Sequence, residues 1–210
     1  MSKTTERSRN TYHVGNLAPQ LMLVAREMLE QVGPAKLSIR AISEKVGVSA
    51  TATYHHYTNR IDLLSHLAAQ GFKELEQALQ TCEKNVTKLD LLRNASLIYF
   101  KFARNNPALY QLMFGPELSS AEKNEILELQ QTRDSAFNEL KKIIGEVLEK
   151  DINSAEVRQG ALASWTYTHG LASLVIHNVF NYSQDITDER FVDRTLQGFE
   201  YLFQSQKKES

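Results

Sequence analysis

Apolar residues recur every three or four positions along almost the whole 210-residue chain, and this helical spacing restricts the fold more than any other feature of the sequence. Only 4 prolines and 9 glycines interrupt it. No segment alternates apolar and polar residues in the way that a half-buried β-strand requires. The sequence therefore predicts an all-α protein, with a three-helix N-terminal helix-turn-helix domain and a larger C-terminal helical domain.

Capping residues and helix breakers set the expected helix boundaries. The helices are expected at about residues 17–32, 39–46, 50–56, 59–79, 91–105, 108–114, 120–149, 154–180 and 188–204. In the first helix, one apolar stripe is formed by Leu21, Val24, Met28 and Val32. The helix that starts after Thr58 places Ile61 on its apolar face. A capping box at Ser119–Glu122 opens the longest helix.

Charge is distributed unevenly along the chain. Residues 1–66 contain 8 Lys and Arg against 5 Asp and Glu, a balance of +3, and the remaining 144 residues contain 16 against 20, a balance of −4. A basic N-terminal third on an acidic body is the pattern expected where one end of a protein meets phosphates.

Several features favour a cytoplasmic protein with no membrane partner. No apolar run approaches the roughly 18 residues of a membrane span. The first dozen residues are polar and basic, without the apolar core of a secretion signal. The single cysteine, Cys82, fits a reducing compartment and is expected to act as a small hydrophobic residue on a helix.

The sequence gives no positive support for an enzyme. It contains no glycine-rich phosphate loop, HExxH, GxSxG or CxxC motif. Adjacent residues on a helix point about 100° apart, so His55 and His56 do not chelate one ion without a third element. We therefore expect no catalytic residue, no cofactor and no metal.

Two short helices joined by residues 47–49, Gly-Val-Ser, predict a helix-turn-helix over about residues 38–57. Ile42, Val46 and Val48 are expected to face a small core under the first helix. The second short helix, with the sequence ATATYHHY, then offers its outer face to a DNA major groove, which is about 12 Å wide. Taken alone, the same turn also fits an ordinary helical corner.

The stretch LSIRAISEKVGVSATATYHHYTNRIDLL, residues 37–64, resembles the signature of the TetR family of bacterial regulators. In that signature a Gly-Val-Ser turn precedes a short helix ending Tyr-x-His-aromatic, then a two-residue joint, a basic residue and Leu-Leu. Residues 12–17, 70–72 and the WTYTHG stretch at 165–170 are similar to one subgroup, whose C-terminal domain is named for its Trp, His and Gly. The resemblance covers residues 12–72 and 107–180.

The resemblance implies a set of DNA-binding residues on the first turn of the second helix, on the reading helix and at the start of the fourth helix. They are Arg40, Ala50, Thr51, Tyr54, His55, His56 and Arg60. The chemistry agrees for the two arginines, because a guanidinium binds guanine or phosphate through two parallel hydrogen bonds. For Arg60 the alternative is a solvated surface arginine.

Two positions depart from the subgroup pattern. Val14 stands where the subgroup usually has histidine, which removes a polar contact from the N-terminal arm. Thr53 stands where the subgroup often has proline, and its hydroxyl on the inner face of the helix needs a backbone carbonyl or a water as partner. Both differences concern the choice of operator.

The last two helices are expected to form a dimer interface. Small residues such as Gly160, Gly170 and Ala172 allow another helix to approach closely, and Phe191, Leu196, Phe199 and Phe203 supply bulk. The family pairs these two helices with their copies in a four-helix bundle. A two-fold homodimer would place two reading helices about 34 Å apart on a pseudo-palindrome.

The aromatic residues of the C-terminal domain are expected first of all in its core. Helical bundles also place ligand sites between their helices, and the residues assigned to such a pocket are Tyr99, Phe102, Phe137, Trp165 and His169. The alternative is a solid core without a ligand.

Together these features predict a homodimeric one-component transcriptional regulator: a repressor that binds a double-stranded DNA operator and is released by an unidentified small-molecule effector. The expected domains are an N-terminal arm (1–15), a DNA-binding domain (16–60) and a helical regulatory and dimerisation domain (61–205). The alternative from another class is a helical small-molecule-binding protein, or an enzyme, whose helix-turn-helix is vestigial.

Overall fold

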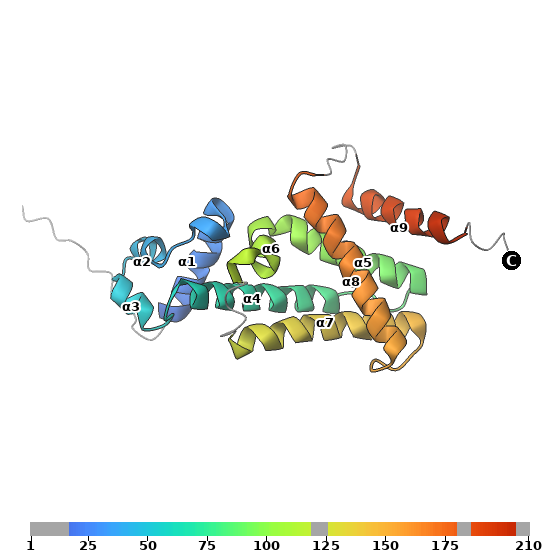
Figure 1. Ribbon diagram of the computed structural model, residues 1–210, viewed down its shortest axis with the longest axis horizontal. Helices are drawn as coiled ribbons and strands as arrows, with labels where there is room; N and C mark the ends of the chain where they lie inside the picture. Colours follow the sequence, from blue (N-terminus) through green and yellow to red (C-terminus); the bar gives the residue numbers. More distant parts are fainter. Residues whose placement is uncertain (1–16, 119–125, 180–185, 205–210) are drawn as a thin grey trace, which may run out of the picture.

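The computed structural model describes residues 17–118, 126–179 and 186–204, which form helices joined by turns (Figure 1). The N-terminal elements are α1 (Leu17–Val32), the 3-10 helix η2 (Pro34–Lys36), α2 (Ile39–Val46) and α3 (Ala50–Tyr54). The other helices are α4 (Arg60–Gln80), α5 (Lys88–Asn105), α6 (Pro107–Phe114), α7 (Leu127–Leu148), α8 (Ala155–Ile176) and α9 (Asp188–Gln204). The predicted fold class is confirmed.

Local capping accounts for the starts of the N-terminal helices. The hydroxyl of Ser38 accepts a hydrogen bond from the N–H of Ala41 at 3.3 Å, and Ser49 caps α3 in the same way. The side chain of Asn59 caps α4, so this helix begins one residue later than predicted. α3 ends at Tyr54, two residues before the expected end.

Two predictions of buried faces were wrong. In α1 the fully buried line is Leu21, Ala25 and Leu29, whereas Val32 is 39% exposed. Apolar residues cover a wide arc of this helix, and the line with the small Ala25 permits the closest packing. In α4, Ile61 is 36% exposed, because the core contact of the first turn is made by its neighbours along the chain.

The ends of the later helices agree with the sequence in part. The capping box expected at Ser119–Glu122 lies outside the described residues, and α7 begins at Leu127. α7 ends where Glu149 adopts a left-handed conformation (φ 52°), as predicted. α8 ends at Ile176, before the expected residue 180. Cys82 is buried as expected, but it lies just after α4 rather than on a helix.

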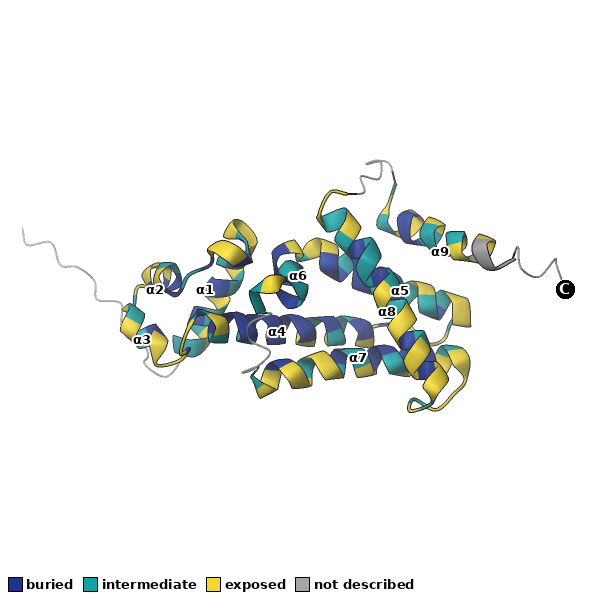
Figure 2. Ribbon diagram, in the orientation of Figure 1, coloured by how far each residue is buried: buried dark blue, intermediate teal, exposed yellow. Residues whose placement is uncertain are grey.

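Helix α4 is the common core element of the two ends of the molecule. Figure 1 places α1, α2 and α3 at one end of an elongated molecule, and α4 runs from them along α6 and α7. Figure 2 shows that α4 is buried along most of its length. Its buried apolar residues are Leu63, Leu64, Leu67, Ala68, Ala69, Phe72, Leu75 and Leu79.

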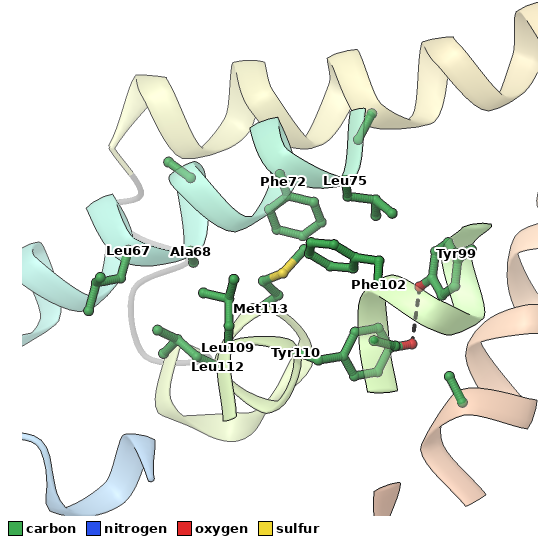
Figure 3. Packing of buried hydrophobic residues seen from close by; sticks show 14 of the residues in the cluster. Leu67, Ala68, Phe72, Leu75, Tyr99, Phe102, Leu109, Tyr110, Leu112 and Met113 are labelled. Carbon is green, nitrogen blue, oxygen red and sulfur yellow. Dashed lines mark hydrogen bonds between the residues drawn. The ribbon is translucent and has the colours of Figure 1, made fainter. Parts of the chain in front are cut away.

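Helices α4 and α6 meet at Gly71. A Cβ atom at this position would lie 2.7 Å from the sulfur of Met113 and 3.1 Å from a methyl group of Leu109. Figure 3 shows these two α6 side chains beside α4, next to the ring of Phe72. A side chain at Gly71 would have to displace the Met113 and Leu109 side chains, so glycine favours the close packing of α6 on α4.

The N-terminus of α6 is held by a residue of α1. The carboxylate of Glu30 accepts hydrogen bonds from the backbone N–H groups of Ala108 (3.1 Å) and Leu109 (3.2 Å). Arg26 donates to Glu30 at 2.5 Å and to the side-chain oxygen of Asn106 at 2.6 Å. A carboxylate at a helix N-terminus satisfies donors that lack partners within the helix. We call the contact of Arg26 and Glu30 with the start of α6 the α1–α6 joint.

Replacing Glu30 tests the joint. We expect Glu30→Ala to lower the free energy of unfolding by about 0.5–2 kcal/mol, the usual cost of removing a helix cap. Glu27 lies on the same helix and is exposed, so Glu27→Ala serves as the matched control and should change stability by less than about 0.5 kcal/mol. Thermal and urea denaturation measure both variants. Equal stability of the two would contradict the capping role of Glu30.

Candidate nucleic-acid interface

The turn between α2 and α3 has the geometry that a helix-turn-helix needs. Gly47 lies in the left-handed region (φ 84°), and its N–H donates to the carbonyls of Ser43 (2.9 Å) and Glu44 (3.1 Å). The N–H of Val48 donates to the carbonyl of Ser43 as well, at 2.9 Å. Glycine adopts this conformation without a steric cost. The sharp reversal predicted at residues 47–49 is therefore present.

Two buried hydroxyls fix α3 against α2. Ser43 and Thr53 are 2% and 0% exposed, and their hydroxyl oxygens lie 2.7 Å apart. The hydroxyl of Ser43 donates to the carbonyl of Ile39 at 2.7 Å, so its oxygen accepts the proton of Thr53. The partner of Thr53 is thus a side chain, not the carbonyl or water expected from the sequence. The pair lies ten residues apart, and no local pattern predicts it.

Helix α3 and the turn that follows it carry five of the residues that the resemblance assigned to DNA. Thr51, Tyr54, His55 and His56 are exposed, and Ala50 is half-buried. The four exposed side chains form no hydrogen bond or ion pair with the described part of the chain. They are available to base edges and phosphates.

The two predicted arginines differ in environment. Arg40, in the first turn of α2, is exposed and has no partner among the described residues. The guanidinium of Arg60 is half-buried and donates to three backbone carbonyls, those of Leu37 (2.8 Å), Pro34 (2.5 Å) and Ala35 (3.2 Å). Arg60 therefore binds the start of α4 to η2. The sequence offered no signal for this contact, because it joins residues more than twenty positions apart.

Tyr57 connects the reading helix α3 to α4. Its ring is 6% exposed, its hydroxyl donates to the carbonyl of Ala18 at 3.4 Å, and it packs edge-on against His66 with 5.3 Å between ring centroids. Burial raises the pKa of the Tyr57 phenol, and the charges of Asp62 and Glu128 add to this effect. The hydroxyl therefore stays protonated and keeps its role as a donor to α1.

Four of the five residues predicted for a ligand pocket come together in the C-terminal domain. The ring centroid of Trp165 lies 5.5 Å from that of Phe137 and 5.9 Å from that of Tyr99. The hydroxyl oxygen of Tyr99 lies 3.5 Å from Nδ1 of His169. Phe102 is buried elsewhere, beside Met113 and Phe72 (Figure 3).

A chain of polar groups runs through this aromatic cluster. The hydroxyls of Tyr99 and Tyr110 lie 3.1 Å apart (Figure 3), the Tyr110 hydroxyl lies 2.6 Å from Nδ1 of His169, and Nε2 of His169 lies 3.4 Å from the Ser173 hydroxyl. Burial raises the pKa of both phenols and lowers the pKa of His169. All four groups are therefore neutral at neutral pH. Tyr110 and Ser173 are members of this chain that sequence reasoning missed.

A groove of about 440 Å³ opens beside these hydrogen-bonded polar groups, where η2, the C-terminal end of α6 and α8 meet. Of the predicted pocket residues, only His169 lines it. The other lining residues are Pro34, Tyr110, Gln111, Phe114, Gly115, Pro116, Glu117, Ser173 and His177. We call this space the η2–α6–α8 groove.

The outer side of α8 and α9 exposes apolar residues. Leu162 is 60% exposed, Leu174 41% and Phe199 40%, and a Cβ atom at Gly170 would meet nothing within 4 Å. Phe191, which was expected on this outer face, instead packs on Phe100 inside the subunit. The side chain of Phe203, also expected in the interface, is not among the side chains that the structure describes.

No group of three or more His, Cys, Asp or Glu side chains in the described part of the chain is placed to hold a metal ion. No helix described here has both the length and the apolar character needed to cross a membrane.

Two family models match this chain. The family model "Bacterial regulatory proteins, tetR family" matches residues 21–67, and the model "Tetracyclin repressor-like, C-terminal domain" matches residues 92–199, just over half of the chain. The nucleoid occlusion factor SlmA of Marinomonas sp. (strain MWYL1) is 22% identical over 145 residues, which are 67% of this chain and 68% of that protein.

Solved structures agree in fold. A protein of unknown function from Rhodococcus sp. RHA1 has a TM-score of 0.74 and 23% identity, covering 91% of this chain and 97% of its own. A bacterial regulatory protein in the tetR family from Rhodococcus RHA1 has a TM-score of 0.62 and 19% identity, covering 89% and 95%. Because family models match both domains, this chain belongs to the TetR family and is a DNA-binding transcriptional regulator.

Proposed function

We propose that the protein is a repressor that binds a pseudo-palindromic operator as a homodimer and leaves it when a small molecule binds the C-terminal domain. The observation that carries this proposal is the reading helix α3, whose inner side is fixed by Thr53 and whose outer side is exposed. A two-fold dimer would present two such helices about one DNA turn apart, roughly 34 Å. The DNA-binding domain would end near residue 60, where α4 begins.

The proposed DNA contacts are divided between bases and backbone. Ala50 and Thr51 are small and permit close approach to base edges, whereas Tyr54, His55 and His56 reach bases or phosphates. Arg40 is the exposed guanidinium nearest to the start of α2, and guanine is its favoured base.

The Arg40 assignment is tested by measuring operator affinity and base preference. Arg40→Ala should weaken operator binding by about 1–3 kcal/mol and relax the preference at one position of each half-site. Lys73→Ala removes an equal charge from an exposed position on α4 and serves as the control. A gel shift with the DNA upstream of the protein's own gene, repeated with a library of half-sites, gives both quantities. Equal weakening of every sequence would identify Arg40 as a phosphate contact instead.

For Arg60 we infer a supporting role in place of the direct phosphate contact that the resemblance implied. Its hydrogen bonds to the carbonyls of Pro34, Ala35 and Leu37 engage the guanidinium within the protein. Arg60 then acts on DNA through the position of η2 and α4.

Arg60→Ala should therefore lower stability by about 1–3 kcal/mol, since it leaves carbonyls without a charged donor. Arg60→Lys should recover little of this loss, because an ammonium does not reproduce the guanidinium geometry. Thermal denaturation measures stability, and binding at several salt concentrations measures phosphate contacts. A salt slope reduced by about one with unchanged stability would restore the phosphate assignment.

We also propose that α8 and α9 form the dimer interface. Leu162, Gly170 and Leu174 lie on one side of α8, and Phe199 extends this apolar face onto α9. The Trp165, His169 and Gly170 positions also support the subgroup with the Trp-His-Gly type of C-terminal domain.

Gly170→Leu tests this interface with little effect on the subunit. The space around Gly170 is open within the subunit, and leucine favours a helix over glycine by about 1 kcal/mol. The variant should therefore keep its helical content and become monomeric in light scattering. Gln77→Leu adds the same side chain at an exposed position of α4 and should remain dimeric. A monomeric parent, or a stable Gly170→Leu dimer, would rule out the interface.

A cytoplasmic location follows from this function, because the operator is in the cytoplasm of a bacterium. The alternative function is a helical small-molecule-binding protein or an enzyme with a vestigial helix-turn-helix. The same gel shift distinguishes the two, since a vestigial domain would bind no upstream fragment.

A further inference from the structure

The η2–α6–α8 groove is lined by residues of both domains. Pro34 belongs to η2 in the DNA-binding domain, and His169 and Ser173 lie on α8. Phe114 is the last residue of α6, and Glu117 follows it after Gly115 and Pro116. Its volume of about 440 Å³ is within the usual range of small-molecule sites. An occupant of this groove would touch the reading domain and the regulatory domain at once.

Among the residues that the structure describes, Glu117 gives the groove a carboxylate that pairs with no cation, and no Lys or Arg lines the groove. The C-terminal end of α6 adds backbone carbonyls, which carry partial negative charge. The side chain of Glu117 folds back toward this helix end. Its Oε2 atom lies 2.8 Å from the position that a Cβ atom would take at Gly115.

The remaining walls suit an apolar group with a positive charge. Tyr110 and Phe114 line the groove, and the face of an aromatic ring attracts a cation. Burial lowers the pKa of His169, so this imidazole is uncharged at neutral pH and does not repel a cation. Its two ring nitrogens are engaged by Tyr110 and Ser173.

We propose that the groove is the effector site and that it takes a small organic cation bearing an aromatic or compact apolar group. This proposal deepens the ligand-released repression proposed above and rests on it. The positive group lies between the carboxylate of Glu117 and the end of α6, and the apolar group lies against Phe114 and Pro34.

The structure offers two short routes from this groove to the reading helix. Pro34 accepts a hydrogen bond from Arg60, the first residue of α4, and α4 is joined to α3 by the buried Tyr57. The other end of α6 is held by Glu30 in the α1–α6 joint. A ligand that separates η2 from α8 would therefore move α1 and α4 together.

The binding test uses three probes of similar size and different charge: benzyltrimethylammonium, its neutral isostere neopentylbenzene, and the anion 3-phenylpropionate. Isothermal calorimetry on the full chain, without DNA, should give the highest affinity for the ammonium probe. Trp165 is the only tryptophan, and its ring lies 6.4 Å from that of Phe114, so its emission should change with the same midpoint.

Glu117→Gln should weaken the ammonium probe about twofold to fivefold, the effect of one ion pair at a half-exposed site, and leave the neutral probe unchanged. Glu83→Gln removes an exposed carboxylate outside the groove and should change neither affinity. Equal affinity for the charged and neutral probes, tighter binding of the anion, or an unaltered Glu117→Gln would overturn the proposed cation site.

The DNA test is separate. Saturating benzyltrimethylammonium should lower operator affinity by about 5–150-fold in the parent, with a midpoint that shifts in Glu117→Gln. Failure of the parent to bind any upstream DNA would overturn the proposed function, while cation binding measured without DNA would stand. Cation binding that leaves operator affinity unchanged would overturn the regulatory role of the groove.

Discussion

The close contact of α4 with α6 at Gly71 is the constraint on which the relation of the two domains depends. A side chain at this position would meet the side chains of Met113 and Leu109, so a larger residue would disturb the packing of α6 on α4. At the observed separation, the start of α6 reaches Glu30 of α1 and its end reaches η2 and α8. A short helix of the C-terminal domain is thus attached at both ends to elements that position the reading helix.

The sequence predicted the features that depend on neighbouring residues. Ser38 and Ser49 cap helices, and Gly47 turns the chain, because each acts on backbone groups within a few positions. The stripe of α1 was predicted less well. A helix with apolar residues over a wide arc can rotate about its axis, and only the packing of the other helices selects Ala25 and Leu29.

The functional contacts that the sequence missed join distant parts of the chain. Thr53 meets Ser43 ten residues away, and Arg60 meets carbonyls more than twenty residues away. The groove combines Pro34, Glu117 and His169, which no spacing rule connects. Most of the aromatic cluster was predicted correctly, because large apolar side chains gather in a core. The groove beside it is lined by other residues, and His169 is the one predicted residue among them.

Part of the positive charge of the N-terminal third is engaged within the protein. Arg26 and Arg60 are engaged in hydrogen bonds within the protein, and Lys45 lies 3.7 Å from Glu27. Among the described residues, the charge offered to DNA is therefore smaller than the count of basic residues suggests. Among the described residues of this region, Arg40 and Lys36 are exposed cations, and Arg40 lies in the first turn of α2.

The fixed inner side of α3 has a consequence for the evolution of this regulator. Thr53 and Ser43 hold the helix in place from within, whereas the side chains of Thr51, Tyr54 and His55 form no hydrogen bond with the described residues. Substitutions on the outer side therefore change the DNA sequence that is recognised with little loss of folding stability. A duplicated gene could come to recognise a new DNA sequence through such changes while the core of the protein stays the same.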